Sequence, residues 1–202
     1  MEIVKLEEYK KTRKLVYLSE GTPAFCLYDR EIRKYGIEEG GELTEEAYAE
    51  ISELLRKRAR ERCLYLLDDM ARTEYQLRSK LKEGFYPENA IEEAISYCRD
   101  KHYIDDLDYA KRFISCRSEK LSIRMIRKKL MEKGIDRDTI DIAFQESEIT
   151  EADTLRAMIE KKYGDPSDLT FEDKQKAMRK LLSAGFSYDA VKRAMNRASD
   201  LT

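Results

Sequence analysis

Apolar positions follow a helical spacing through most of the chain. From residue 44 onward, apolar side chains recur every three or four residues, and the clearest stripes cover residues 63–71, 91–98 and 123–130. This spacing places them on one face of a helix and predicts about nine helices. Polar residues suited to capping helix N-termini precede several stripes. These are Thr73, Asp106, Ser122, Asp136, Thr150 and Ser187.

The first 43 residues have a different pattern. Short apolar runs at residues 3–6, 15–18 and 24–28 are typical of strands, and turn-forming residues 19–23 separate the last two. The pattern predicts a small antiparallel meander. Such a sheet is not stable alone, so we expect a short helix from Asp29 to Tyr35, ended by Gly36, to cover one face.

The chain also repeats itself. Gly84, Gly134 and Gly185 each follow a basic helical segment that contains a leucine, and they lie 50 and 51 residues apart. Glycine suits the residue after a helix because it accepts a left-handed backbone without a Cβ clash. The first copy is one residue shorter between its leucine and its glycine. Three such junctions at one period predict three copies of a three-helix repeat.

The predicted fold is therefore mainly α-helical, with three tandem three-helix repeats and a small N-terminal antiparallel β segment. We place the β segment and short helix at residues 1–43, and the repeats at 44–100, 101–148 and 149–202. Because each repeat contacts only its neighbours, we expect an elongated, curved array.

Composition supports solvated helices. Of the 202 residues, 40% are charged and 42% hydrophobic, with only 8 glycines and 3 prolines. The net charge of −2 neither favours nor excludes a polyanionic partner. No stretch approaches the roughly 18 apolar residues of a membrane span, and the N-terminus lacks the apolar segment of a signal peptide. We expect a monomeric, cytoplasmic protein.

No catalytic motif is visible, and we expect neither enzymatic activity nor a cofactor. The four cysteines, Cys26, Cys63, Cys98 and Cys116, are far apart in apolar surroundings, so we expect buried thiols. His102 is the one histidine and has no companions at metal-ligand spacing. The carboxylates near Asp106 lack the rest of a calcium loop and suit helix capping better, so no metal site is predicted.

Basic residues gather in the middle repeat. Residues 111–133 hold nine lysines and arginines but only two acids, Glu119 and Glu132. Such a local excess can meet a polyanion even when the whole chain is nearly neutral, although an ordinary solvated helix face is the alternative. The candidate contact residues are Lys111, Arg112, Arg117, Lys120, Arg124, Arg127 and Lys128. Another basic cluster, Arg56–Arg58 with Arg60 and Arg62, lies in the first repeat.

Several short motifs resemble the RecX family. Residues 103–110 read Tyr-Ile-Asp-Asp followed by Tyr-Ala, and residues 126–135 resemble that family's helix-closing motif. Residues 72–85 resemble the matching segment of its first repeat, and residues 36–43 resemble the extra β segment of its longer members. The order of these motifs, together with the repeat period, makes the resemblance specific over nearly the whole chain.

The resemblance implies a partner and an activity. RecX-type proteins bind the RecA filament on single-stranded DNA in its groove and inhibit its ATPase, strand exchange and coprotease activities. A negative regulator of RecA, with direct DNA contact left open, is thus the expected function. The alternatives are a nucleic-acid-binding repeat protein that acts without RecA and a helical scaffold for another protein.

Overall fold

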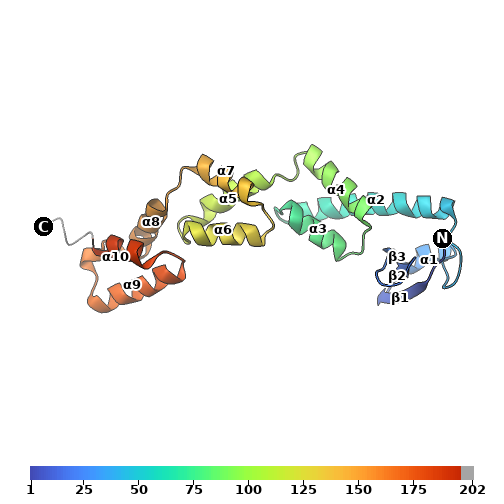
Figure 1. Cartoon of the computed structure of the whole chain (residues 1–202), viewed down its shortest axis with the longest axis horizontal. Helices are drawn as coiled ribbons and strands as arrows, with labels where there is room; N and C mark the ends of the chain where they lie inside the picture. Colours follow the sequence, from blue (N-terminus) through green and yellow to red (C-terminus); the bar gives the residue numbers. More distant parts are fainter. Residues whose placement is uncertain (197–202) are drawn as a thin grey trace. The chain divides into compact units, whose positions relative to one another are not determined.

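The computed structural model describes residues 1–196 and divides into two compact units, Met1–Asp105 and the part from Asp106 onward (Figure 1). A three-stranded antiparallel sheet opens the first unit. Its strands β1 (Lys5–Lys10), β2 (Arg13–Tyr17) and β3 (Phe25–Tyr28) are adjacent in chain order. Val16 lies opposite Phe25. Because side chains alternate between the faces of a strand, these two share one buried face with Leu27.

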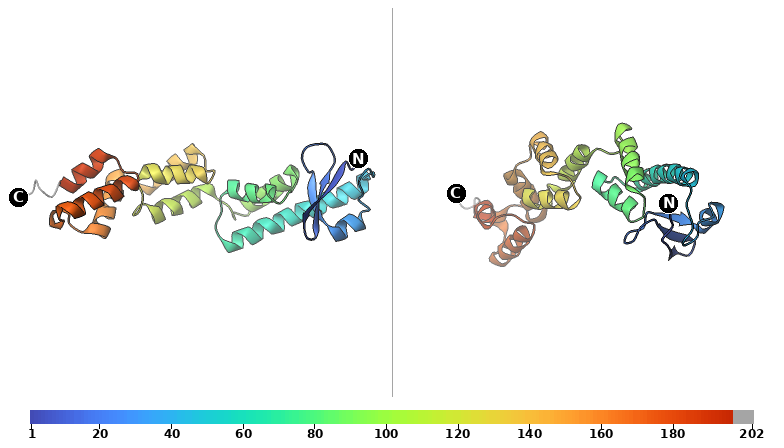
Figure 2. Two further views of the ribbon diagram at one scale, coloured as in Figure 1. Left: turned by 90° about the horizontal axis from the view of Figure 1, so that it is seen from below. Right: turned by 45° about the vertical axis from the view of Figure 1, so that its right-hand side comes forward.

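Two helices cover this face of the sheet. They are α1 (Asp29–Lys34) and the first half of α2 (Glu45–Asp69), and Figure 2 shows the strands beside this half of α2. Ile32 of α1 and Ile51 and Leu55 of α2 share one core with the strands. The predicted meander and its covering helix are therefore present. The helix begins at Asp29, and Tyr28 holds the cap position.

The first three-helix repeat uses the same long helix. The second half of α2 packs with α3 (Glu74–Lys82) and α4 (Glu88–Asp100), and Cys63, Leu77 and Ile91 lie in this separate core. Thr73, one of the predicted caps, forms a capping box with Gln76 at the start of α3, with bonds of 3.2 and 3.1 Å. Helix α2 thus contributes one half to each of two cores.

The second unit holds six α-helices within its described residues. The first three are α5 (Asp106–Arg117), α6 (Ile123–Glu132) and α7 (Arg137–Ser147), which enclose a core around Ile126 and Leu130. The others are α8 (Glu151–Tyr163), α9 (Phe171–Ser183) and α10 (Tyr188–Asn196), with the 3₁₀ turn η1 (Pro166–Asp168) before α9. The last six residues of the predicted third repeat, 197–202, lie outside the described residues.

The two three-helix groups of the second unit are joined at the start of α6. The backbone N–H of Ser122 donates to the carbonyl of Ala184 at 3.1 Å, and the next N–H, of Ile123, donates to the Glu151 carboxylate at 2.9 Å. Gly185 lies against Ser122 and Met125 so closely that no Cβ would fit. These contacts satisfy backbone donors that a helix N-terminus leaves without partners.

The left-handed residues at the repeat junctions differ in one case from the glycine pattern. Gly134 and Gly185 have φ of 82° and 96°, as predicted, but in the first repeat Phe85 holds this conformation, with φ of 56°. The left-handed position falls four residues after the last core leucine, and the shorter first copy places Gly84 one residue early. Gly84 is instead packed closely, because a Cβ there would lie 2.9 Å from the Tyr86 ring.

The predicted fold class is confirmed in its helical content, its small sheet and its three tandem three-helix groups. One prediction about the cysteines is wrong. Cys26, Cys63 and Cys98 are buried, whereas Cys116 is exposed. Cys116 follows the buried Ile114 by two residues, which turns it about 200° away from the core face of α5.

Candidate functional site

The seven basic residues predicted to form a contact surface all lie along the first two helices of the second unit. Lys111, Arg112 and Arg117 are on α5, Lys120 is in the connecting loop, and Arg124, Arg127 and Lys128 are on α6. The core side chains of α6, Ile126 and Leu130, are fully buried on its other side. The structure therefore brings these basic residues to one helix–loop–helix segment and keeps them out of the core.

Carboxylates neutralise four of the seven cations. The pairs are Lys111–Glu146, Arg112–Asp108, Arg127–Asp141 and Lys128–Glu132. Glu146 and Asp141 belong to α7, which lies outside the segment in which the sequence showed a basic excess. A count of charges along the chain cannot include acids that a neighbouring helix supplies. The surplus of basic over acidic side chains on the folded surface is therefore smaller than the surplus counted along residues 111–133.

Arg127 has a structural role that the repeat itself reveals. It pairs with Asp141, 14 residues later, and Arg78 of the first repeat pairs with Glu92 at the same separation of 14 residues. In both repeats this bridge joins the second helix to the third. The Arg127 guanidinium also lies 4.7 Å from the centre of the Phe144 ring. Arg78 and Glu92 are separated in the sequence by the same number of residues as Arg127 and Asp141. This repeated spacing is the sequence signal that could have identified Arg127 as part of an interhelical salt bridge.

Three of the predicted cations make no ion pair with any described residue: Arg117, Lys120 and Arg124. We call them the junction trio, because they surround the loop between α5 and α6. All three are exposed. The acid nearest in sequence, Glu119, is bound by Lys161 of α8, and this contact lowers the pKa of the Glu119 carboxyl. Glu119 also interacts electrostatically with Lys120, but its ion pair is with Lys161, so the trio keeps a net positive charge.

The segment that carries the trio is held firmly at both ends of its loop. The N–H groups of Lys120 and Leu121 donate to the carbonyl of Arg117 at 2.9 and 3.0 Å. The buried hydroxyl of Ser122 caps α6 by accepting from the N–H of Met125 at 3.3 Å. Side chains on fixed helix ends lose less freedom on binding than side chains on a mobile loop, which favours the trio as a contact surface.

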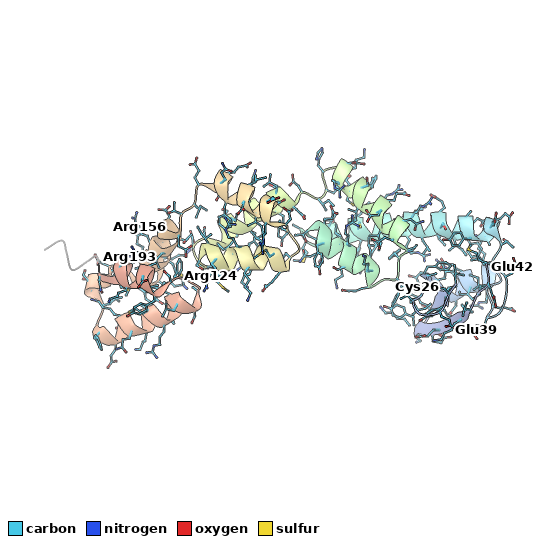
Figure 3. The ribbon with its side chains drawn as sticks, viewed as in Figure 1. Cys26, Glu39, Glu42, Arg124, Arg156 and Arg193 are labelled. Carbon is cyan, nitrogen blue, oxygen red and sulfur yellow. The ribbon has the colours of Figure 1, made fainter. Side chains whose placement is uncertain are left out.

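The second unit also has a pocket that sequence reasoning missed. A cavity of about 630 Å³ lies between α8, η1 and α10, and apolar side chains such as Leu155 and Ile159 form part of its wall. Arg156 and Arg193 line it as well and are marked in Figure 3. Glu151 is another lining residue, and its carboxylate already binds the N–H of Ile123 at 2.9 Å. Because both arginines and glutamates line the pocket, it does not favour ligands of one charge.

The described residues offer little for metal chemistry or membrane insertion. Within residues 1–196, no three histidine, cysteine, aspartate or glutamate side chains gather as a metal site. No helix in this range combines the length and the apolar character that a membrane crossing requires.

Comparison with known families gives matches to three successive domains. The RecX first, second and third three-helix domains match residues 59–98, 105–143 and 150–195. The chain belongs to the RecX family. These ranges fall within the three helical groups described above, and the boundaries that we placed at residues 43, 100 and 148 remain our proposal.

Relatives and solved structures of RecX agree with this assignment. The regulatory protein RecX of Pectobacterium atrosepticum is 37% identical over 54% of this chain and 68% of its own length. That of Caldanaerobacter subterraneus subsp. tengcongensis is 29% identical over 97% and 99%. A crystal structure of regulatory protein RecX covers 96% of this chain and 98% of its own, with a TM-score of 0.58 and 27% identity. RecX from Lactobacillus salivarius shares the fold, with a TM-score of 0.58, 23% identity and coverage of 73% and 98%.

Proposed function

We propose that this member of the RecX family binds the RecA filament on single-stranded DNA in its groove and inhibits the filament's ATPase, strand exchange and coprotease activities. The observation that carries the proposal is the match of three successive RecX domains, together with relatives that are named regulatory proteins. It acts in the cytoplasm as a monomer, without a cofactor and without chemistry of its own.

The junction trio is the part of the second repeat that we assign to the filament contact. Its three cations are exposed and lack carboxylate partners among the described residues, and they stand on two helix ends and the hydrogen-bonded loop between them. Acidic patches of RecA and the phosphates of the DNA both complement such a surface. The paired cations, Lys111, Arg112, Arg127 and Lys128, contribute less, because a partner must first displace their carboxylates.

The test measures RecA ATPase activity on single-stranded DNA with increasing amounts of the protein. Wild type should inhibit, and the double variant Lys120→Glu with Arg124→Glu should inhibit less while it keeps its helical circular dichroism. We leave Arg127 unchanged, because reversing its charge would set a glutamate against Asp141 and disturb the fold.

A matched control separates a local contact from a general charge effect. Arg179→Glu with Lys192→Glu reverses two exposed cations of the third repeat that form no ion pair with residues 1–196, and it changes the net charge equally. We expect this control to inhibit nearly as wild type does. Exposed charges act over about 8 Å at physiological ionic strength, so the trio variant should also show a weaker dependence on salt. Equal inhibition by wild type and the trio variant at every salt concentration would remove the trio from the contact.

A further inference from the structure

A cluster of arginines surrounds one tyrosine of the N-terminal unit. The guanidinium carbons of Arg13, Arg58 and Arg30 lie 4.5, 4.9 and 5.6 Å from the centre of the Tyr28 ring. They come from β2, α2 and α1, so the fold brings together cations that are distant in sequence. Arg13 also donates a hydrogen bond to the Tyr28 hydroxyl. The ring stabilises each cation through its negative face, but it carries no charge to balance them.

Few acids in this region balance the cluster. Glu31 binds Arg58 through two hydrogen bonds, of 2.5 and 3.3 Å, and also accepts from the N–H of Tyr28. Within residues 1–196, Arg13 and Arg30 make no ion pair. The same holds for Lys10 at the end of β1 and Lys11 in the turn that follows, which extend the positive surface. Asp29 also lies here and lines a hollow with Tyr28 and Arg30. The cations of this surface therefore outnumber its nearby acids, Glu31 and Asp29.

The cluster continues along α2 toward exposed aromatic rings. Arg62 follows Arg58 by four residues and therefore lies on the same face of the helix. Its guanidinium lies 5.3 Å from the centre of the Tyr65 ring. Tyr65 is 68% exposed, which is unusual for so large an apolar surface. The other arginines of this helix, Arg56 and Arg60, point elsewhere and pair with Glu93.

Tyr65 does not stand alone. It lines a shallow hollow of about 560 Å³ with Leu64, Leu67, Asp68 and Tyr103. Tyr103 is 51% exposed and comes from the turn after α4. Two exposed rings beside leucine side chains offer flat apolar faces, and Asp68 offers an acceptor for amino groups. The distance along α2 from Arg58 to Tyr65 is about 10 Å, the length of about three stacked nucleotides.

We propose that this surface of the N-terminal unit is a contact site for single-stranded nucleic acid. The arginines around Tyr28, together with Arg62, hold the sugar–phosphate backbone, and Tyr65 and Tyr103 take unstacked bases in the hollow. We call it the strand track. Interleaved guanidinium groups and exposed aromatic rings are the combination with which proteins bind single strands without reading their sequence. An acidic peptide would use the arginines but would leave the exposed rings without a flat partner.

The strand track rests on the proposed function in one respect, namely that a single strand is present where the protein binds. The experiment therefore uses DNA without RecA. The probe is a fluorescent oligothymidylate of about 20 nucleotides, longer than the site of a typical single-strand-binding fold. The anisotropy of the probe is measured as the full-length protein is added, at several salt concentrations.

Two pairs of variants test the two parts of the track. Tyr65→Ala should weaken binding about tenfold, because stacking of one base on a ring has an effect of this order. Tyr65→Phe keeps the ring and should bind as wild type. The control Tyr75→Ala removes another exposed ring, 55% exposed, from α3 and should have little effect. Arg62→Gln should make the log–log salt slope shallower by about 0.7, whereas Lys57→Gln, on another face of α2, should change it less.

Each alternative result contradicts the proposal in a distinct way. If wild type inhibits RecA but does not bind the oligothymidylate, the strand track is wrong and the proposed function stands. If Tyr65→Ala binds the probe as wild type but inhibits RecA poorly, this surface contacts protein and not a strand. Equal losses in Tyr65→Ala and Tyr75→Ala would show that the hollow is not the site.

Discussion

Replacing Gly185 with alanine tests how the second and third three-helix domains are joined. Gly185 has φ of +96°, a conformation that side-chain-bearing residues rarely adopt. An alanine Cβ at this position would lie 2.3 Å from Cγ of Met125 and 2.6 Å from the Ser122 hydroxyl oxygen. Ser122 is fully buried and cannot move without disturbing the start of α6. The substitution therefore strains both its own backbone and the junction between the two domains.

Two costs add to give the expected magnitude. A left-handed conformation costs a residue with a Cβ about 1–2 kcal/mol relative to glycine. Forcing an extra carbon into a filled site costs about 1–3 kcal/mol, at the low end if the flexible Met125 side chain moves aside. We therefore expect Gly185→Ala to lower the free energy of unfolding by about 2–5 kcal/mol. If the domains separate instead, the bond from Ser122 to Ala184 is lost, which costs about 1 kcal/mol.

The assay is urea unfolding followed by circular dichroism, with two comparisons. Gly36 also has a positive φ, of 60°, but no atom lies within 4 Å of its missing Cβ, so Gly36→Ala should show the backbone cost alone. In a double-mutant cycle, Met125→Ala should reduce the cost of Gly185→Ala, because it removes the nearest clashing atom. If Gly185→Ala costs no more than Gly36→Ala, or if Met125→Ala does not change its cost, the described packing at this junction is wrong.

Three further predictions concern other parts of the chain. Gly134→Val should lower the melting temperature, at a cost on the order of 1 kcal/mol or more, because a β-branched residue tolerates a φ of 82° poorly; an unchanged melting temperature would contradict this. Burial would raise the pKa of the Glu74 carboxyl, but hydrogen bonds from Arg99 and Arg78 outweigh burial and hold it below its ordinary value of 4.5. The stability that this carboxylate contributes is present above that pH and lost as the pH falls through its lower folded value, so Glu74→Gln should flatten the acid limb of a stability–pH curve; an unaltered limb would refute this assignment. Mass spectrometry after brief alkylation should find the label first on Cys116, because the other cysteines are buried; rapid labelling of all four would contradict the described cores.

The sequence predicted those features that depend on local spacing. The period of Gly134 and Gly185 identified the repeats, because a left-handed helix end can be recognised from one residue type. The capping box at Thr73 and the cap at Ser122 also follow from a few adjacent residues, and the structure confirms both. Helix ends, repeats and strands could be predicted because their causes lie within one or two turns of the chain.

Features that depend on packing between helices were not predicted. Asp141 neutralises Arg127 from a different helix, so a charge count along one segment overstated the basic surface. Phe85 takes a left-handed conformation where a glycine was expected, and its ring packs edge-on against Tyr9 of the sheet at 4.9 Å. Of the proposed strand track, the sequence indicated only the basic cluster that contains Arg58 and Arg62. Arg13 could not be added to it, because Arg13 and Arg58 meet at Tyr28 only after the sheet packs against α2.

The most direct test of the account is a binding comparison among three partners: the RecA filament assembled on single-stranded DNA, free RecA and the same DNA alone. The protein, carrying a fluorescent label, is titrated with each partner, at one salt concentration and with an ATP analogue that RecA does not hydrolyse. We expect binding to the filament to be at least about tenfold tighter than to either component, a difference of about 1.4 kcal/mol. Equal affinity for bare DNA and for the filament would indicate a nucleic-acid-binding protein that does not require RecA, and no binding to the filament would contradict the central claim.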